Sequence, residues 1–269
     1  MFHGNGDLLD QITLQHGPHK LLARFFLIAQ QHAHDKGVIL RLSSDFARMQ
    51  RIRRCYVDIP PTTSPHWDPA HSDFPIDSSF WIEGVNAAGE TVLTHAARFF
   101  DWPRTTLKDE LESLRIHFRD PKPHLAAGES MTITSPSAER ITGRNTFAGA
   151  MWVRDDHRRR GLTRIVPRIS RAYAYTRWKT AFTWGLMDPM LHEYGVSRAY
   201  GRYTVEPSMH ANLACWPHSN GVLLWMTHET LLQEINDVVA HATNDLSRKI
   251  DIPSTMVSSP RRHGSRTRP

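Results

Sequence analysis

Three arginines lead into a glycine at the centre of the chain, between an apolar run and a helical pattern. The stretch reads HRRRG and ends at Gly161, after the apolar residues 147–153 and before the helix expected at 163–179. The first backbone N–H groups of such a helix have no partner within it, and they point together at one place. That place favours an anion, most often a phosphate or pyrophosphate. The pattern therefore predicts a phosphate-binding turn at residues 158–161, which we call the Arg–Gly turn.

The composition is that of a globular protein. The chain has 269 residues, of which 40% are hydrophobic and 22% charged, and this length is enough to bury a core. No window approaches the roughly 18 uninterrupted apolar residues of a membrane-spanning helix, and no secretory signal pattern opens the chain. Cys55 and Cys215 lie far apart, which argues against a disulfide framework. We expect a cytoplasmic protein with no membrane association.

The charge balance is basic, mainly because of the last residues. The formal net charge is +6, and residues 261–268 alone hold four arginines and no acid. Without them the body is only mildly basic, which favours an ordinary solvated surface. A surface that binds the phosphates of a nucleic acid is the alternative.

The hydrophobic periodicity predicts alternating strands and helices between an irregular lead-in at 1–19 and a disordered basic tail at 251–269. Residues 60–75 hold five prolines and must form a loop, and 121–128 is a second loop. Helices are expected at 21–34, 46–57, 105–118, 163–179, 189–194 and 229–242. Strands are expected at 38–42, 79–85, 91–99, 131–133, 140–154, 181–187, around 198–205 and at 221–227. The strand–helix–strand order at 147–187 predicts one parallel crossover.

The Arg–Gly turn in this setting resembles the central motif of the GNAT superfamily of acyl-CoA N-acyltransferases. The pattern is R-x-x-G-x followed by a small residue, and it matches Arg158, Gly161 and Thr163, although the family prefers glycine or alanine at the last position. The upstream order of a strand, two helices and a hairpin is similar to the family, as is the downstream segment from Tyr194 to Arg202. The resemblance implies one mixed α/β domain over 20–250. Its sheet is mostly antiparallel, with one parallel strand–helix–strand crossover and helices on both faces.

The resemblance also implies an activity, the transfer of an acyl group from acetyl-CoA or another acyl-CoA to an amine. The turn would bind the pyrophosphate of coenzyme A, and a backbone N–H of the preceding strand would polarise the thioester carbonyl. The cofactor-binding residues implied are Met151, Trp152, Val153, Arg158, Arg159, Arg160, Gly161, Leu162 and Thr163. The acceptor amine, the acyl chain length and the oligomeric state stay open.

Two catalytic roles follow from the same resemblance. A tyrosine would protonate the leaving thiolate, and Tyr194 is the first choice, with Tyr200 and Tyr203 as rivals. A carboxylate would serve as general base, and Glu83 on the expected hairpin is the first choice. Glu139 and Asp155 are the other candidates for this role.

Several other features have two interpretations. Seventeen histidines include no HExxH or His–Cys cluster, and we expect no metal. Arg51, Arg53 and Arg54 favour a solvated helix face, with a site for an acidic acceptor as the alternative. His66 and Trp67 in the Pro-rich loop suggest an aromatic cover over a binding cleft. The alternative functions are a nucleic-acid-binding protein and a catalytically inactive CoA-binding α/β protein.

Overall fold

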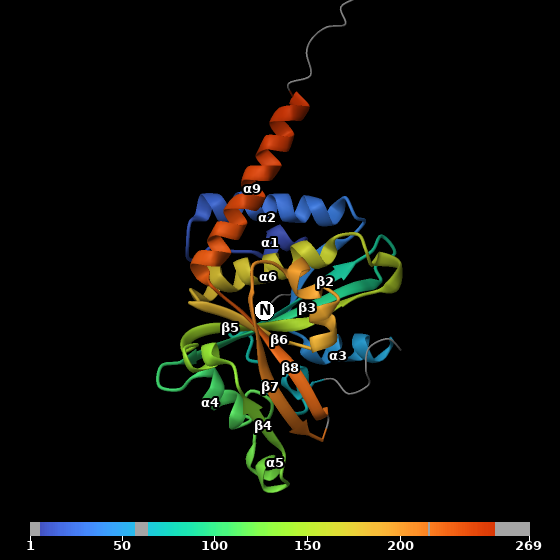
Figure 1. Ribbon diagram of the computed structural model, residues 1–269. Coiled ribbons are helices and arrows are strands. Elements are labelled where there is room, and N and C mark those ends of the chain that lie inside the picture. Colours follow the sequence, from blue (N-terminus) through green and yellow to red (C-terminus); the bar gives the residue numbers. More distant parts are fainter. Residues whose placement is uncertain (1–5, 57–63, 215, 251–269) are drawn as a thin grey trace, which may run out of the picture.

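One eight-stranded sheet runs through the whole molecule (Figure 1). The computed structural model describes residues 6–56, 64–214 and 216–250. The strand order is β1-β2-β3-β5-β6-β8-β7-β4, and every neighbouring pair is antiparallel except β5 and β6. The strands are β1 (Ile39–Ser43), β2 (Ser79–Val85), β3 (Thr91–Trp102), β4 (Ser130–Ile133), β5 (Gly143–Val153), β6 (Phe182–Met187), β7 (Thr204–Leu213) and β8 (Trp216–Thr227). The predicted fold class is confirmed.

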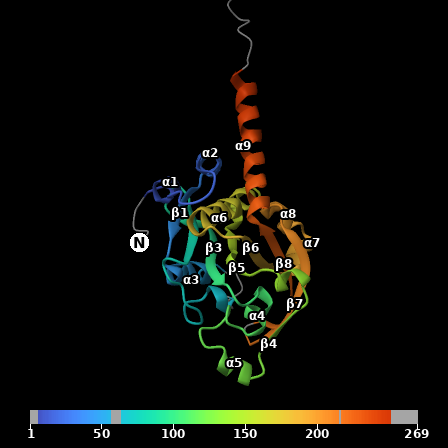
Figure 2. The same cartoon turned by 90° about the vertical axis from the view of Figure 1, so that its left-hand side faces the viewer.

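Helices cover both faces of the sheet (Figures 1 and 2). One face carries α1 (Leu8–Gln11), α2 (His19–His34), α6 (Leu162–Trp178) and α9 (His228–Ile250), whose apolar side chains share one buried cluster. The other face carries α3 (Phe46–Arg54), α4 (Leu107–Glu112) and the 3₁₀ turn η1 (Pro65–Trp67), around a second cluster. The remaining elements are α5 (Lys122–Ala126), η2 (Pro136–Glu139), η3 (Asp155–His157), α7 (Pro189–Glu193) and α8 (Val196–Tyr200).

Strand alternation explains the two clusters. Successive side chains of a strand point to opposite faces, so Phe80 and Ile82 of β2 join the cluster under α2 and α6, whereas Trp81 joins the one beside α3. The crossover from β5 to β6 consists of one turn and one helix, as the sequence predicts. The helix α6 begins right after Gly161 and returns the chain to β6, parallel to β5.

Some elements differ from the sequence-based expectations. The lead-in contains α1, and Leu8 is fully buried there. The helix α4 ends early because Leu114 takes a positive φ of 61°, although the expected apolar stripe is still buried. The loop at 121–128 contains α5, and only α3 and η1, rather than two helices, follow the first strand. The predicted strand around 198–205 is wrong at its start, since residues 196–200 form α8 between Gly195 and Gly201, both with positive φ.

The segment between β3 and β5 makes a long excursion. It holds α4, α5, β4 and η2, and β4 pairs antiparallel with β7 at the far edge of the sheet. Within the described residues, no helix is long and apolar enough to cross a membrane. Cys55 is an exposed free thiol, while Cys215 and the tail predicted at 251–269 lie outside the described residues.

Candidate active site

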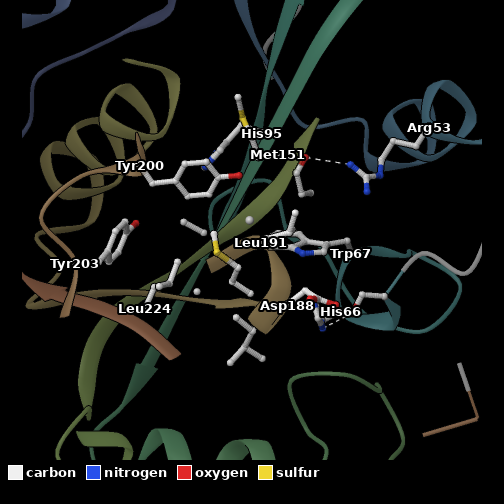
Figure 3. A pocket seen from close by; sticks show the side chains of 17 residues that line it. Arg53, His66, Trp67, His95, Met151, Asp188, Leu191, Tyr200, Tyr203 and Leu224 are labelled. Carbon is white, nitrogen blue, oxygen red and sulfur yellow. Dashed lines mark hydrogen bonds between the residues drawn. The ribbon is translucent and has the colours of Figure 1, made fainter. Parts of the chain in front are cut away.

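A cavity lies where the two parallel strands part. The register pairs residues 145–147 of β5 with 182–184 of β6 and extends no further. Just beyond, the Ala148 carbonyl approaches Gly185 so closely that a Cβ at Gly185 would lie 2.7 Å from its oxygen. A cavity of about 310 Å³ opens there, lined from both faces of the sheet (Figure 3). Its position at the carboxyl ends of parallel strands is where α/β sheets commonly bind ligands.

A bulge in β5 shapes the wall of this cavity. The β3–β5 register shifts between Thr94 and Ala96, which leaves Ala150 and Met151 outside the regular ladder. Ala150 takes a positive φ of 51°, and its carbonyl accepts hydrogen bonds from Thr94 Oγ1 (3.0 Å) and Arg53 Nη1 (3.1 Å). Both bulged residues line the cavity. A bulge of this kind turns backbone groups away from the ladder, so that they can meet a ligand.

The Arg–Gly turn has the geometry predicted from the sequence. Arg159 and Gly161 have positive φ values of 60° and 82°, and Gly161 caps α6 without a side-chain hydrogen bond. The first N–H groups of α6 therefore lack a side-chain cap and remain suited to an anion. Arg158 folds back on the carbonyl of Val153, with its Nε 2.9 Å from that oxygen.

Cations line a hollow beside the Arg–Gly turn. A hollow of about 630 Å³ is lined by His32 and by five cations from three segments, Lys36, Arg159, Arg160, Arg164 and Arg168, with no carboxylate among its lining residues. A smaller hollow of about 220 Å³, lined by Val153, Arg158 and Thr163 among others, lies against the inner side of the turn. The cofactor residues predicted from the sequence gather along these hollows, except Met151, which lines the cavity between the strands, and Trp152. That side chain is buried against Tyr56, with ring centroids 4.2 Å apart.

The predicted catalytic residues do not line the cavity. Tyr194 is 75% exposed at the end of α7. Glu83 is buried, and its oxygens accept two hydrogen bonds from Arg48 (2.6 and 2.8 Å) and one from Thr91 (2.5 Å). These contacts tie the carboxylate to α3 and β3 rather than to the cavity. The alternatives are also engaged elsewhere, Glu139 with Lys108 and Asp155 with Arg158.

Other titratable side chains do line the cavity (Figure 3). Tyr200, Tyr203 and His95 lie on the side of α6 and α8. Burial raises the pKa of the Tyr200 hydroxyl, so it holds its proton at neutral pH. Burial, aided by Arg171, lowers the pKa of His95 to about 3, and its buried Nδ1 has no hydrogen-bond partner among the residues that the structure describes.

A histidine pair on the opposite side fixes one proton position. The Nδ1 atoms of His66 and His117 are 2.9 Å apart, and His117 Nε2 lies 3.3 Å from Met131 Sδ. Because a thioether can only accept, His117 carries its proton on Nε2, and its Nδ1 accepts from His66. This tautomer leaves the lone pair of His66 on Nε2. Ser64 Oγ lies 2.9 Å from Nε2 and 2.7 Å from Nδ1 of the same ring. Burial is the main cause that lowers the pKa of both histidines.

Sequence reasoning missed most of this constellation. It singled out His66 and Trp67 only as a cover for a cleft, and it gave no role to His95 or His117. These side chains come from four separate segments, and no spacing rule connects them. A charged or polar residue within a buried strand, such as the histidine in TVLTHAARF, is the one signal that points to His95.

The comparisons with known proteins return solved structures. No protein-family model matches the chain, and no curated protein matches it. A mutant of the SpeG spermidine N-acetyltransferase from Vibrio cholerae matches at 8% identity, over 73% of this chain and 96% of that chain, with a TM-score of 0.44. NAA60 from Arabidopsis thaliana in complex with acetyl-CoA matches at 13% identity, over 71% and 98%, with a TM-score of 0.42. RimJ from Mycobacterium smegmatis in complex with CoA-disulfide matches at 14% identity, over 77% and 89%, with a TM-score of 0.41.

Among the described residues, no group of three or more His, Cys, Asp or Glu side chains is arranged to hold a metal ion.

The fold assignment depends on the features of this chain itself. A mostly antiparallel sheet contains one parallel pair, β5 and β6, whose strands part at a bulge. The Arg–Gly turn and α6 connect the two strands. Together these features match the GNAT-like fold that the sequence predicted.

Proposed function

We propose that the protein is an acyl-CoA-dependent N-acyltransferase that uses acetyl-CoA as its donor. The observation that carries the proposal is the pairing of two sites at the same end of β5. A turn with free helix N–H groups and surrounding cations suits the phosphates of coenzyme A. A split between two strands suits the amide-containing pantetheine arm, which can form hydrogen bonds with the unpaired strand edges.

In the proposed reaction, the thioester lies at the bulge of β5. A backbone N–H near Met151 polarises its carbonyl and stabilises the oxyanion of the tetrahedral intermediate. His66 Nε2 removes a proton from the acceptor amine, directly or through Ser64 Oγ, since both line the cavity. The neutral amine attacks the carbonyl carbon and forms the new C–N bond. The second proton that this nitrogen loses restores the Tyr200 hydroxyl after the thiolate has been protonated.

Collapse of the intermediate breaks the C–S bond and releases the thiolate of coenzyme A. Tyr200 donates its hydroxyl proton to this thiolate; its place in the cavity supports this role, and burial keeps the hydroxyl protonated until that step. His117 acts as a positioning residue, because it holds the His66 tautomer that leaves Nε2 unprotonated. The roles predicted for Tyr194 and Glu83 pass to Tyr200 and His66 in this proposal.

Calorimetry with coenzyme A and acetyl-CoA tests the donor. We expect binding by the wild-type protein, and a loss of about 10- to 100-fold in affinity when Arg159 and Arg160 are both replaced by glutamine. Arg140→Gln, at an exposed arginine on the excursion, is the control and should bind normally.

The same experiments separate the alternatives. No heat with either ligand at millimolar concentration would overturn the proposal. Binding to DNA or RNA that weakens steeply with salt would then favour the nucleic-acid alternative. Acetyl-CoA binding without thiol release, over a broad panel of amines, would instead indicate an inactive CoA-binding protein.

A further inference from the structure

Arg53 differs from the other arginines of α3. Arg48, Arg51 and Arg54 each pair with a carboxylate, from Glu83, Asp45 and Asp68 respectively. Within the part of the chain that the structure describes, no carboxylate pairs with Arg53. The sequence favoured a solvated face for 51–54, and this holds for the exposed Arg51 and Arg54 but not for Arg53. Its side chain instead turns inward to the cavity (Figure 3).

The contacts of Arg53 leave half of its guanidinium unused. Nη1 makes both hydrogen bonds that Arg53 forms with described residues, to Ala150 O (3.1 Å) and Thr94 Oγ1 (3.5 Å). Nε is buried without an acceptor. Burial lowers the pKa of Arg53 to about 10, so the side chain is still a cation at neutral pH. Nε is covered by protein, so Nη2, which makes no hydrogen bond with these residues, is the charged donor left for a ligand in the cavity.

A buried cation of this kind requires a counter-charge. Removing a charge from water is costly unless an opposite charge or strong hydrogen bonds compensate. In the proposed reaction, the phosphates of the donor bind at the Arg–Gly turn, and the thioester end carries no charge. An acceptor that carries an anion would supply the counter-charge. A charge-assisted hydrogen bond from Nη2 to a carboxylate oxygen is the contact that this geometry allows.

We propose that the acceptor is a small amino carboxylate, such as a free amino acid, whose carboxylate binds Arg53. This inference rests on the proposed function. Arg53 contacts the carbonyl of Ala150, the residue before the one whose N–H would polarise the thioester. The attacking amine and the carboxylate are therefore separated by a short spacer. Trp67 forms the adjoining wall of the cavity.

The test compares matched acceptors that differ only in the carboxylate. Wild-type protein and Arg53→Gln are assayed for thiol release from acetyl-CoA, with a panel of amino acids and the carboxamide of each. We expect the wild-type protein to prefer amino acids, and Arg53→Gln to lose roughly 10- to 100-fold in kcat/KM for them. Its kcat/KM for the carboxamides should change much less, so that the preference disappears.

Two control variants separate this role from a structural one. Thr94→Val removes the other side-chain donor to Ala150 O and so loosens the bulge without changing the charge. It should lower kcat/KM for the amino acids and for the carboxamides by the same factor. Arg51→Gln, at an exposed neighbour on α3, should leave both rates unchanged. If Arg53→Gln does not fold, Arg53→Lys replaces it, since it keeps the charge but loses the planar fork, and a reduced preference is expected.

The outcomes are distinct. The inference is overturned if the wild-type protein prefers amino acids over their carboxamides by less than threefold, or if Arg53→Gln loses kcat/KM equally for both. Either result leaves the acyltransferase proposal intact. Absence of acetyl-CoA binding in the calorimetric experiment overturns both. Turnover with a preference that depends on Arg53, but not on Thr94, supports both.

Discussion

Glu234 provides a sharp test of how the face that carries α6 is held together. It lies on α9 with a side chain only 4% exposed, and accepts hydrogen bonds from Arg171 (2.7 Å) and Arg168 (2.9 Å). Its Oε1 also accepts from the backbone N–H of Arg202 at 3.2 Å. The Arg171 side chain is completely buried, so this carboxylate is its counter-charge. Glu234→Gln keeps the shape of the side chain but removes that charge.

The expected loss of stability follows from the burial of the pair. Breaking a buried ion pair by neutralising one partner typically costs about 3–5 kcal/mol, because the remaining charge is left uncompensated. We expect the lower half of this range, since Arg168 is 17% exposed and Tyr203 still contacts Arg171, with its hydroxyl 3.2 Å from Nη1. The amide nitrogen of glutamine also places a donor beside a guanidinium, so one favourable contact becomes unfavourable.

Asp237→Asn on the same helix is the matched control. Asp237 pairs with Arg202 at 2.5 Å, but the two side chains are 43% and 55% exposed. Exposed pairs contribute about 0–1 kcal/mol. Both substitutions remove one negative charge from the same helix, but their effects on the free energy of unfolding should therefore differ by about 2–4 kcal/mol.

Urea denaturation measures this difference, and the melting temperature gives a second readout. For a domain of this size, 1 kcal/mol corresponds to roughly 2–4 °C, so Glu234→Gln should melt about 6–16 °C below the wild type. A difference of less than about 1 kcal/mol between the two variants would show that the buried pair is compensated by other groups, which would refute the reasoning.

Three further predictions concern the cavity and pH. Tyr200→Phe should lower kcat by about 10²- to 10⁴-fold while the exposed Tyr194→Phe does not, as measured by thiol release; equal rates would remove Tyr200 from the mechanism. Gly185→Ala should cost about 1–3 kcal/mol in denaturation experiments and raise the KM for acetyl-CoA, because the new Cβ meets a strand carbonyl at 2.7 Å. Burial lowers the folded-state pKa of His95 and His117 to about 3, so their contribution to stability is complete above pH 6.5 and is lost as the pH falls from there towards 3. Each should contribute about 1.4 kcal/mol per pH unit in that window, and His95→Gln should reduce the slope by one proton; an unchanged slope would contradict the assignment.

The sequence was sufficient for the crossover because its determinants are local. The apolar run of β5, the glycine before α6 and the apolar run of β6 each act over a few residues. An anion site at a helix N-terminus is likewise a property of one turn. For this reason the cofactor half of the candidate site could be proposed before the structure was known.

The catalytic half depends on contacts between distant segments. Periodicity placed Glu83 on a strand, but not within reach of Arg48 from α3. The glycines at 195 and 201 were read as the start of a strand, whereas their positive φ values delimit α8, which brings Tyr200 rather than Tyr194 to the cavity. His66 and His117 are 51 residues apart in the chain, and they meet only because the segment between β3 and β5 brings His117 back to η1.

The excursion that carries β4 also changes how the sheet ends. Without β4, the strand β7 would present its backbone groups along the outer edge, a surface that other chains can extend by strand addition. The four residues of β4 cover positions 209–212, and Thr134 N donates to Ser208 O at 2.8 Å. Pro207 follows directly on the uncovered side and has no N–H to offer. The cover and the proline together protect this edge, so self-association by strand pairing at β7 is disfavoured even though the sheet is open.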